Sequence, residues 1–137
     1  MSAIFADSAY WIALLHRRDQ WHRQALAVSR TLAPRTLVTT EWVLAEFLAF
    51  FSAAGEAPRR RAAERTRGIL RSPTVQVLAP DQALFQDGLA LYERRPDKEY
   101  SLTDCISMQV MRRDGLTDVL TNDRHFTQEG FHILFHG

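Results

Sequence analysis

Short apolar runs alternate with longer amphipathic stretches along this chain. The runs are rich in apolar and β-branched side chains, which is typical of buried strands, and the stretches between them, bounded by Ser, Thr, Asp, Gly or Pro, favour helices. Short strands that alternate with helices form parallel sheets covered on both faces. We expect strands over residues 3–6, 36–39, 75–78, 119–121 and 132–135, and helices over 8–16, 21–32, 59–70, 80–94 and 104–114, with one further helix that Thr39 or Thr40 caps.

Turn and capping residues set the expected ends of two of these helices. Gly55 and Pro58 are expected to end the helix that follows the second strand. Thr103 is expected to cap the last long helix, and Gly115 to end it. Because no segment rich in Pro, Gly or Ser divides the chain, we expect one three-layer α/β/α domain over residues 1–137, with a five-stranded parallel sheet.

The composition agrees with a folded globular domain. Of the 137 residues, 46% are hydrophobic and 24% are charged, so a buried core is expected and disorder is not. The net charge of +1 excludes a strong uniform field for nucleic acid. Lys98 is the single lysine among 17 basic residues, and arginine suits phosphate contacts, although genome base composition also produces this bias. Cys105, the only cysteine, excludes an intrachain disulfide and a thiolate metal cage.

Targeting signals are not evident in the sequence. The first residues, MSAIFADSAYW, lack the basic segment and the long apolar stretch of a signal peptide. No apolar run approaches the ~20 residues that a membrane-spanning helix needs. We therefore expect a cytoplasmic protein that does not enter a membrane.

A carboxylate interrupts the most apolar segment of the chain. Glu46 lies within the run from residue 42 to residue 51, WVLAEFLAFF, and its neighbours on a helix would be Trp42, Ala49 and Phe50. An ionised carboxylate in apolar surroundings is costly unless it is paired, hydrogen-bonded or bound to a metal. Either a buried ion pair with an arginine or a cluster with other acids would explain Glu46.

Three other acids lie where a parallel sheet binds its ligands, beyond the carboxyl ends of its strands. Asp7 follows the first expected strand, Asp123 follows the fourth, and Asp104 begins a helix. Each also has a local explanation, because Asp7 could cap a helix, residues 101–104 match a capping box, and Asp123 is a turn former. Together with Glu46, however, the acids would repel one another, and a divalent cation relieves that repulsion. Oxygen ligands favour Mg²⁺ or Mn²⁺ and point to phosphoryl chemistry.

Four stretches resemble the PIN-domain nucleases, and most closely the VapC-type toxin ribonucleases. They are FADSAYW at residues 5–11, TTEWVLAE at 39–46, SLTD at 101–104 and LTNDRHF at 120–126, and they occur in the family's order and with family-like spacing. The closing Gly130-Phe131 before a final strand is also similar to this family.

The resemblance implies a PIN-like fold and a metal-dependent endoribonuclease that uses Mg²⁺ or Mn²⁺, with one or two ions equally compatible. Asp7 and Asp104 would be the principal metal ligands, and Glu46 and Asp123 would complete the acidic cluster. A bound cation would lower the pKa of a coordinated water and stabilise charge on the phosphate. The resemblance further implies an RNA substrate, a homodimer and a cognate antitoxin. Small polar residues beside the acids would orient them, namely Ser8, Thr103, Thr121 and Asn122.

Two further features have open interpretations. Arg59, Arg60 and Arg61 belong to a basic helix that would either contact RNA phosphates or form a solvated face. His125, two residues after Asp123, would either touch substrate or play a structural role near the turn.

Other functions on a similar sheet fit less well. A haloacid-type phosphatase needs a second aspartate where this chain has Ala9, and a receiver domain needs a lysine after its last strands, whereas Lys98 precedes Asp104. A PIN-like module that binds RNA or protein without catalysis is a second alternative. An RNA-processing nuclease that is not a toxin is a third.

Overall fold

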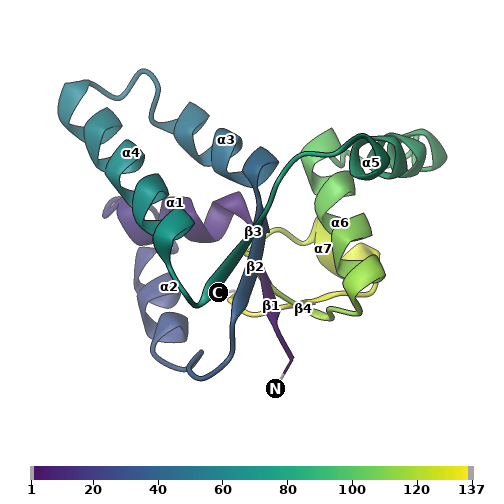
Figure 1. The fold of residues 1–137 in the computed structure, drawn as a ribbon, viewed down its shortest axis with the longest axis horizontal. Coiled ribbons are helices and arrows are strands. Elements are labelled where there is room, and N and C mark those ends of the chain that lie inside the picture. Colours follow the sequence, from purple (N-terminus) through teal and green to yellow (C-terminus); the bar gives the residue numbers. More distant parts are fainter. Residues whose placement is uncertain (1, 136–137) are drawn as a thin grey trace.

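Five parallel strands form one sheet at the centre of the molecule. The computed structural model describes residues 2–135, and its strands lie in the order β3-β2-β1-β4-β5. Figure 1 shows α1, α2 and α4 on one side of the sheet and α5, α6 and α7 on the other, so the expected three-layer α/β/α fold is confirmed. The strands are β1 (Ile4–Ala6), β2 (Leu37–Thr40), β3 (Val75–Leu78), β4 (Asp118–Leu120) and β5 (His132–Ile133).

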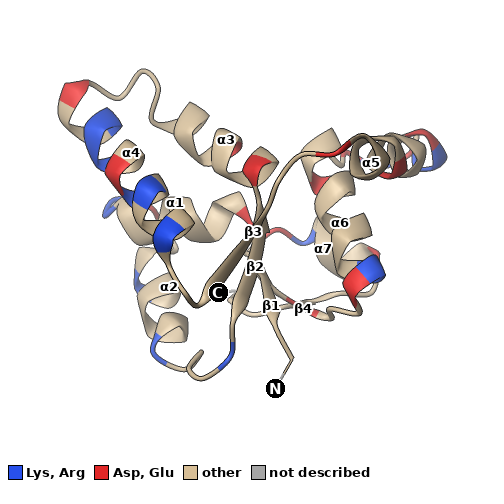
Figure 2. Ribbon diagram, viewed as in Figure 1, with Lys and Arg blue, Asp and Glu red and all other residues tan. Residues whose placement is uncertain are grey.

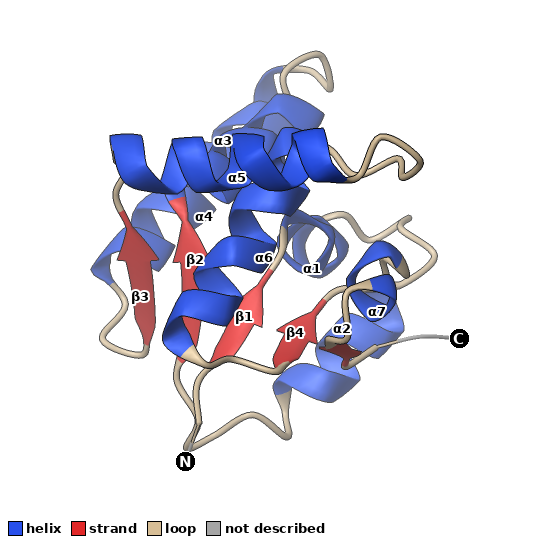
Figure 3. Ribbon diagram, turned by 90° about the vertical axis from the view of Figure 1, so that its right-hand side faces the viewer, coloured by secondary structure: helices blue, strands red, loops and turns tan. Residues whose placement is uncertain are grey.

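The helices also follow the expected pattern, and Figure 3 shows α6 in front of the sheet and α5 above the ends of β2 and β3. The short helix α7 was not predicted, because four residues are too few to display a helical period. No helix within residues 2–135 is long and apolar enough to cross a membrane. The helices are α1 (Ser8–Leu15), α2 (His22–Ser29), α3 (Glu41–Phe50), α4 (Glu56–Arg71), α5 (Gln82–Arg94), α6 (Leu102–Asp114) and α7 (His125–Gln128).

Strand β1 is the centre of the core. All three of its residues are buried, and Phe5 lies in register with Val38 of β2 and Val119 of β4. A strand that is buried on both faces has a continuous apolar sequence, which is why residues 3–6 predicted it. Because β1 and β4 are neighbours, the residues that follow them emerge side by side.

Local hydrogen bonds decide where the helices begin. The Thr40 side chain accepts a hydrogen bond from the Val43 N–H at 3.1 Å, as expected for the N-cap of α3. The expectation that Thr103 caps α6 is wrong. Ser101 is the N-cap, because its hydroxyl accepts from the Asp104 N–H and the Asp104 carboxylate accepts from the Ser101 N–H, both at 3.0 Å. This reciprocal capping box satisfies two backbone donors at once.

Of two residues that were expected to end helices, one does so and the other does not. Gly115 ends α6 in the left-handed conformation, with φ of 68°, as predicted. Pro58, in contrast, does not separate α3 from α4 but lies in the first turn of α4, which begins at Glu56. A proline there breaks no helical hydrogen bond, because the first N–H groups of a helix have no partner within it.

Gly88 permits α5 and α6 to approach closely. A Cβ atom at Gly88 would lie 2.3 Å from Ile106 Cγ1 and 3.1 Å from the Ile106 backbone. Gly88→Ala should therefore lower the free energy of unfolding by about 2 kcal/mol, because overpacking outweighs the gain in helix propensity. Gly68→Ala in α4 is the matched control, since a Cβ there meets nothing within 4 Å. It should raise stability by about 0.5–1 kcal/mol. Urea unfolding of both variants checks this, and equal effects would contradict it.

Candidate active site

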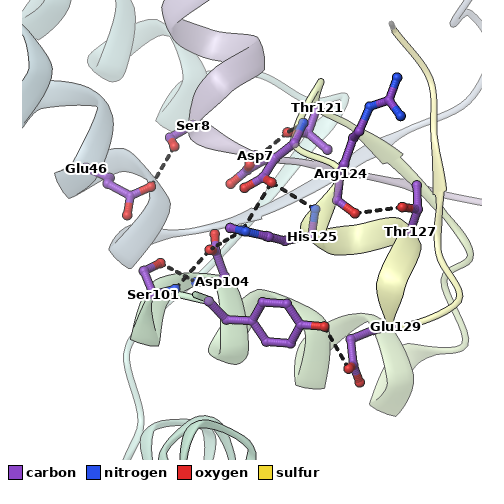
Figure 4. A network of polar contacts seen from close by, with 12 residues as sticks. Asp7, Ser8, Glu46, Ser101, Asp104, Thr121, Arg124, His125, Thr127 and Glu129 are labelled. Atoms are coloured by element: carbon purple, nitrogen blue, oxygen red, sulfur yellow. Dashed lines mark hydrogen bonds and ion pairs between the residues drawn. The ribbon is translucent and has the colours of Figure 1, made fainter. Parts of the chain in front are cut away.

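Four acidic side chains lie near one another at the carboxyl edge of the sheet. Asp7 follows β1 directly, and its backbone N–H donates to the Leu120 carbonyl at the end of β4. Asp123 follows β4, Asp104 lies in the first turn of α6, and Glu46 lies on α3. Figure 4 shows Asp7, Glu46 and Asp104 converging on one region from three different elements.

Asp7 is the most deeply buried of the four. It is 3% exposed and occupies the N-cap position of α1, yet its carboxylate makes no capping hydrogen bond. Thr121 Oγ1 donates to Asp7 Oδ2 at 3.0 Å, while Oδ1 is buried without a partner in residues 2–135. Burial, followed by the negative charge of Asp104, raises the pKa of Asp7 to about 8. The capping explanation of Asp7 therefore fails.

Asp104 takes part in the capping box of α6 and also faces the cluster. Its Oδ2 accepts from the Ser101 N–H, so the capping box expected from residues 101–104 is confirmed. Burial raises the pKa of Asp104, and the charges of Asp123 and Glu46 add to the shift against the hydrogen bonds from Ser101. The structural role and the cluster role are thus combined in one carboxylate.

Glu46 has no cationic partner in the described part of the chain. Ser8 Oγ donates to its Oε1 at 2.6 Å, and no lysine or arginine among residues 2–135 lies within ion-pair distance of it. The alternative of a buried ion pair with an arginine is therefore wrong. Glu46 instead contributes to the field that acts on Asp7 and Asp104.

Asp123 and His125 complete the site from the turn after β4. Asp123 Oδ1 accepts from the His125 N–H at 2.9 Å, so the turn-forming role expected of Asp123 is present. Ligand atoms of Asp104, Asp123 and His125 all lie within 4.8 Å of one another. This is the only such group of three potential ligands in the described part of the chain, and neither Asp7 nor Glu46 joins it at that distance.

The small polar residues expected to orient the acids divide into two pairs. Ser8 binds Glu46, and Thr121 links two acids, because its hydroxyl donates to Asp7 and accepts from the Asp123 N–H. Thr103 and Asn122 are half-buried beside the acids but make no side-chain hydrogen bond within residues 2–135.

The donor set fits a divalent cation. Asp7 Oδ1 is a buried carboxylate oxygen without a partner, and an unmet acceptor of this kind costs free energy. No lysine or arginine within residues 2–135 lies at ion-pair distance from these acids, and burial together with the charges of neighbouring acids raises the pKa of Asp7 and of Asp104. Asp7, Asp104, Asp123 and Glu46 would hold the ion, directly or through water.

The arginines expected to contact RNA do not form one surface. Figure 2 shows basic residues along α4, which lies across the sheet from α6. Arg59 and Arg60 border a hollow beside Leu48, and Arg60 pairs with Glu56 at 2.6 Å. Arg61 instead borders a larger pocket of about 830 Å³, together with Arg65 and the aromatic rings at the end of α3, and none of the four acids lines it.

A PIN domain is the class that this fold and site define. The PIN domain model matches residues 4–131, so the chain belongs to the PIN domain family. It is 28% identical over 128 residues to the 23S rRNA-specific endonuclease VapC20 of two Mycobacterium tuberculosis strains, covering 93% of this chain and 95% of that protein.

A solved structure supports the same assignment. The crystal structure of M. tuberculosis VapC20, described as a sarcin-ricin loop cleaving toxin, matches with a TM-score of 0.84 and 27% identity. The match covers 94% of this chain and 96% of that one. The resemblance drawn from the four sequence stretches is confirmed.

His125 is the site residue that sequence reasoning undervalued. It was placed near the turn or the substrate, whereas its ring lies between two of the acids. The available signal was its spacing of two residues from Asp123. In a turn this spacing allows the His125 side chain to lie close to the Asp123 carboxylate. The direction of the ring, however, depends on backbone angles that no sequence pattern specifies.

Proposed function

We propose that this protein is a metal-dependent endoribonuclease that hydrolyses RNA phosphodiester bonds with Mg²⁺ or Mn²⁺, in a PIN-like domain that spans residues 1–137. The observation that carries the proposal is a group of four carboxylates that have no lysine or arginine partner within residues 2–135, one of which, Asp7, is buried with an oxygen that has no partner there. Stability alone does not favour such a group. A site that holds a cation and a phosphate explains it.

Each acid has a distinct task in this proposal. Asp7 and Asp104 are the principal ligands, Asp123 completes the coordination beside Asp104, and Glu46 bears on the cluster from α3. Thr121 and Ser8 orient Asp7 and Glu46 through the hydrogen bonds described above. The ion supplies a water of lowered pKa and stabilises charge on the phosphate. The protein therefore needs no covalent nucleophile.

The relatives suggest the biological setting. VapC20 is named as an endonuclease of 23S rRNA and as a sarcin-ricin loop cleaving toxin. We propose that this chain is likewise the toxin of a type II toxin–antitoxin pair, acts on RNA in the cytoplasm and is silenced by a cognate antitoxin. We also propose a homodimer, for which the exposed Phe85 and Tyr92 on α5 offer apolar surface. Light scattering at micromolar concentration tests the dimer, and a monodisperse monomer would contradict it.

The two alternatives make different demands on the site. A PIN-like module that only binds RNA or protein does not need four acids, and the buried Asp7 Oδ1, which has no hydrogen-bond partner within residues 2–135, would then serve no purpose. An RNA-processing nuclease would share the chemistry but not the toxicity. Expression of the chain in growing cells distinguishes these functions, because only the toxin arrests growth in a manner that an antitoxin reverses.

Metal removal tests the enzymatic proposal. Purified protein should cleave structured RNA, including a sarcin–ricin loop oligonucleotide, in the presence of Mn²⁺ or Mg²⁺. EDTA should abolish cleavage, and excess Mn²⁺ should restore it, because the water and the phosphate depend on the ion. Gel analysis of end-labelled RNA measures the rate. Cleavage that continues at the same rate in EDTA would remove the metal from the mechanism.

Arg59, Arg60 and Arg61 are exposed and consecutive on α4, although they border two different hollows, and we further propose that each contacts a phosphate of bound RNA. Neutralising all three to Gln should weaken binding and reduce the slope of log K against log salt concentration by up to ~2, since each phosphate contact contributes about 0.7 on single strands. Fluorescence anisotropy over a salt series measures this slope. Arg23→Gln neutralises one exposed arginine on α2 and is the control for neutralising any one of these three arginines. An unchanged slope in the triple variant would show that α4 is a solvated face.

A further inference from the structure

The imidazole of His125 lies inside the acid cluster. Its Nδ1 is 3.2 Å from Asp123 Oδ1 and 3.8 Å from Asp104 Oδ2. Although 28% of the side chain is exposed, Nδ1 itself is buried and has no hydrogen-bond partner in the described structure. Figure 4 shows the His125 ring beside Asp104, and the distances place the same nitrogen near Asp123 as well.

Two contacts hold this ring in place. The backbone N–H of His125 donates to Asp123 Oδ1, which turns the imidazole back toward the same carboxylate. From the other side the Tyr100 ring packs against the imidazole in an edge-on arrangement, with ring centroids 5.3 Å apart. The ring is consequently positioned by the protein without help from a ligand.

Tyr100 is held in turn by a buried acid outside the cluster. Its hydroxyl donates to Glu129 Oε2 at 2.9 Å, and Arg95 and Arg112 also donate to this carboxylate, whose side chain is 5% exposed. Burial opposes ionisation of Glu129, yet the hydrogen bonds from Arg95, Arg112 and Tyr100 lower its pKa to about 2. Glu129 thus stays charged and holds Tyr100 in its position beside His125.

We propose that His125 Nδ1 is a metal ligand of the active site, together with Asp104 and Asp123. The inference rests on the proposed metal-dependent function and names one donor of its ion. Ligands at ~2.1 Å in neighbouring octahedral positions are separated by about 3 Å. The observed separations of 3.2 and 3.8 Å are close to that value, and all three ligand atoms lie within 4.8 Å of one another.

A nitrogen ligand would also affect which ion binds. Mg²⁺ prefers oxygen ligands and several waters, whereas imidazole suits first-row transition ions. A site with His125 should therefore favour Mn²⁺ over Mg²⁺ more strongly than a site built from carboxylates alone. This preference distinguishes a ligand from a residue that only supports the turn.

Electron paramagnetic resonance of bound Mn²⁺ tests the proposal without a mutation. The natural protein should show the hyperfine coupling of a directly bound ¹⁴N nucleus, and protein grown with ¹⁵N-histidine should replace it with a ¹⁵N coupling. His125→Phe, which keeps a ring beside Tyr100, should lose the coupling. It should also raise the Kd for Mn²⁺ about tenfold or more, because loss of even a residue that supports a metal ligand lowers metal affinity by about this factor. The Kd for Mg²⁺ should rise less.

A matched control and the contrary outcomes separate the two proposals. His132→Gln removes another histidine that pairs with an aspartate, Asp118 at 3.1 Å, and should leave the coupling intact. Mn²⁺ that binds without a nitrogen coupling would overturn the His125 assignment while the metal-dependent nuclease stands. Reduced cleavage by His125→Phe with coupling and Mn²⁺ affinity unchanged would also overturn it, in favour of a contact with RNA. Failure of Mn²⁺ to bind at all would overturn both.

Discussion

Asp104→Asn should lower the rate of metal-dependent RNA cleavage by about a thousandfold. Loss of a ligand removes several kcal/mol of transition-state stabilisation, and each 1.36 kcal/mol corresponds to a factor of ten. The fold should persist, because an asparagine oxygen can still accept the hydrogen bond that Asp104 Oδ2 receives from the Ser101 N–H. Single-turnover cleavage in Mn²⁺ measures the rate, and thermal unfolding in EDTA measures the integrity of the variant.

Asp114→Asn is the matched control for this experiment. Asp114 ends the same helix, α6, and pairs at the surface with Arg113 at 3.1 Å. Exposed pairs of this kind contribute little, so cleavage should be unchanged. Equal cleavage by the natural protein and Asp104→Asn would identify a contaminating nuclease or a different site. Glu46→Gln, which keeps the contact with Ser8 available, extends the series to α3.

Asp7→Asn should stabilise the metal-free protein at pH 8. An aspartate in an unfolded chain has a pKa of about 3.9, whereas burial and the charge of Asp104 raise the pKa of Asp7 to about 8 in the fold. Between these values the folded chain holds a proton that the unfolded chain has released. The free energy of unfolding therefore falls as the pH rises from about 4 to about 8, by up to the order of 5 kcal/mol.

The variant should lack the part of this pH dependence that comes from Asp7, because asparagine does not titrate, whereas Asp104, whose pKa burial also raises, keeps its own part. In the natural protein Mn²⁺ should restore stability at pH 8, since the ion replaces the proton, and it should do so much less in Asp7→Asn. Urea unfolding in EDTA and in Mn²⁺, from pH 5 to pH 8, measures both effects. A natural protein whose stability in EDTA is constant over this range and equal to that of the variant would disprove the prediction.

The pKa of Asp118 is shifted in the opposite direction to that of Asp7, so its effect on the pH dependence of stability has the opposite sign. Although burial opposes it, hydrogen bonds from Arg35 and His132 lower the pKa of Asp118. Its contribution to stability is present above the pKa of an unfolded aspartate and is lost as the pH falls. Asp118→Asn should therefore lower stability at neutral pH with or without Mn²⁺. The two aspartates follow and begin neighbouring strands, so the comparison isolates the effect of the site.

The local pattern of the sequence was enough to predict most of the fold. The apolar runs identified all five strands. The bounds of β3 agree residue for residue, because turn-forming residues lie before and after this strand and limit it on both sides. β5 is shorter than expected, since its register with β4 covers His132 and Ile133. Pro58 was misplaced, because a proline that ends one helix and a proline in the first turn of the next leave the same mark in a sequence.

What the sequence by itself determined is the parallel α/β fold and the order in which four acids reach one edge of the sheet. Both follow from the periodicity of apolar residues and from the rule that parallel strands end on the same side. The tertiary structure alone decided that Asp7 makes no cap, that Glu46 binds Ser8 rather than an arginine, and that His125 lies between two carboxylates. These facts depend on the direction of side chains from segments far apart in the chain, and that direction is set by packing, which local patterns do not record.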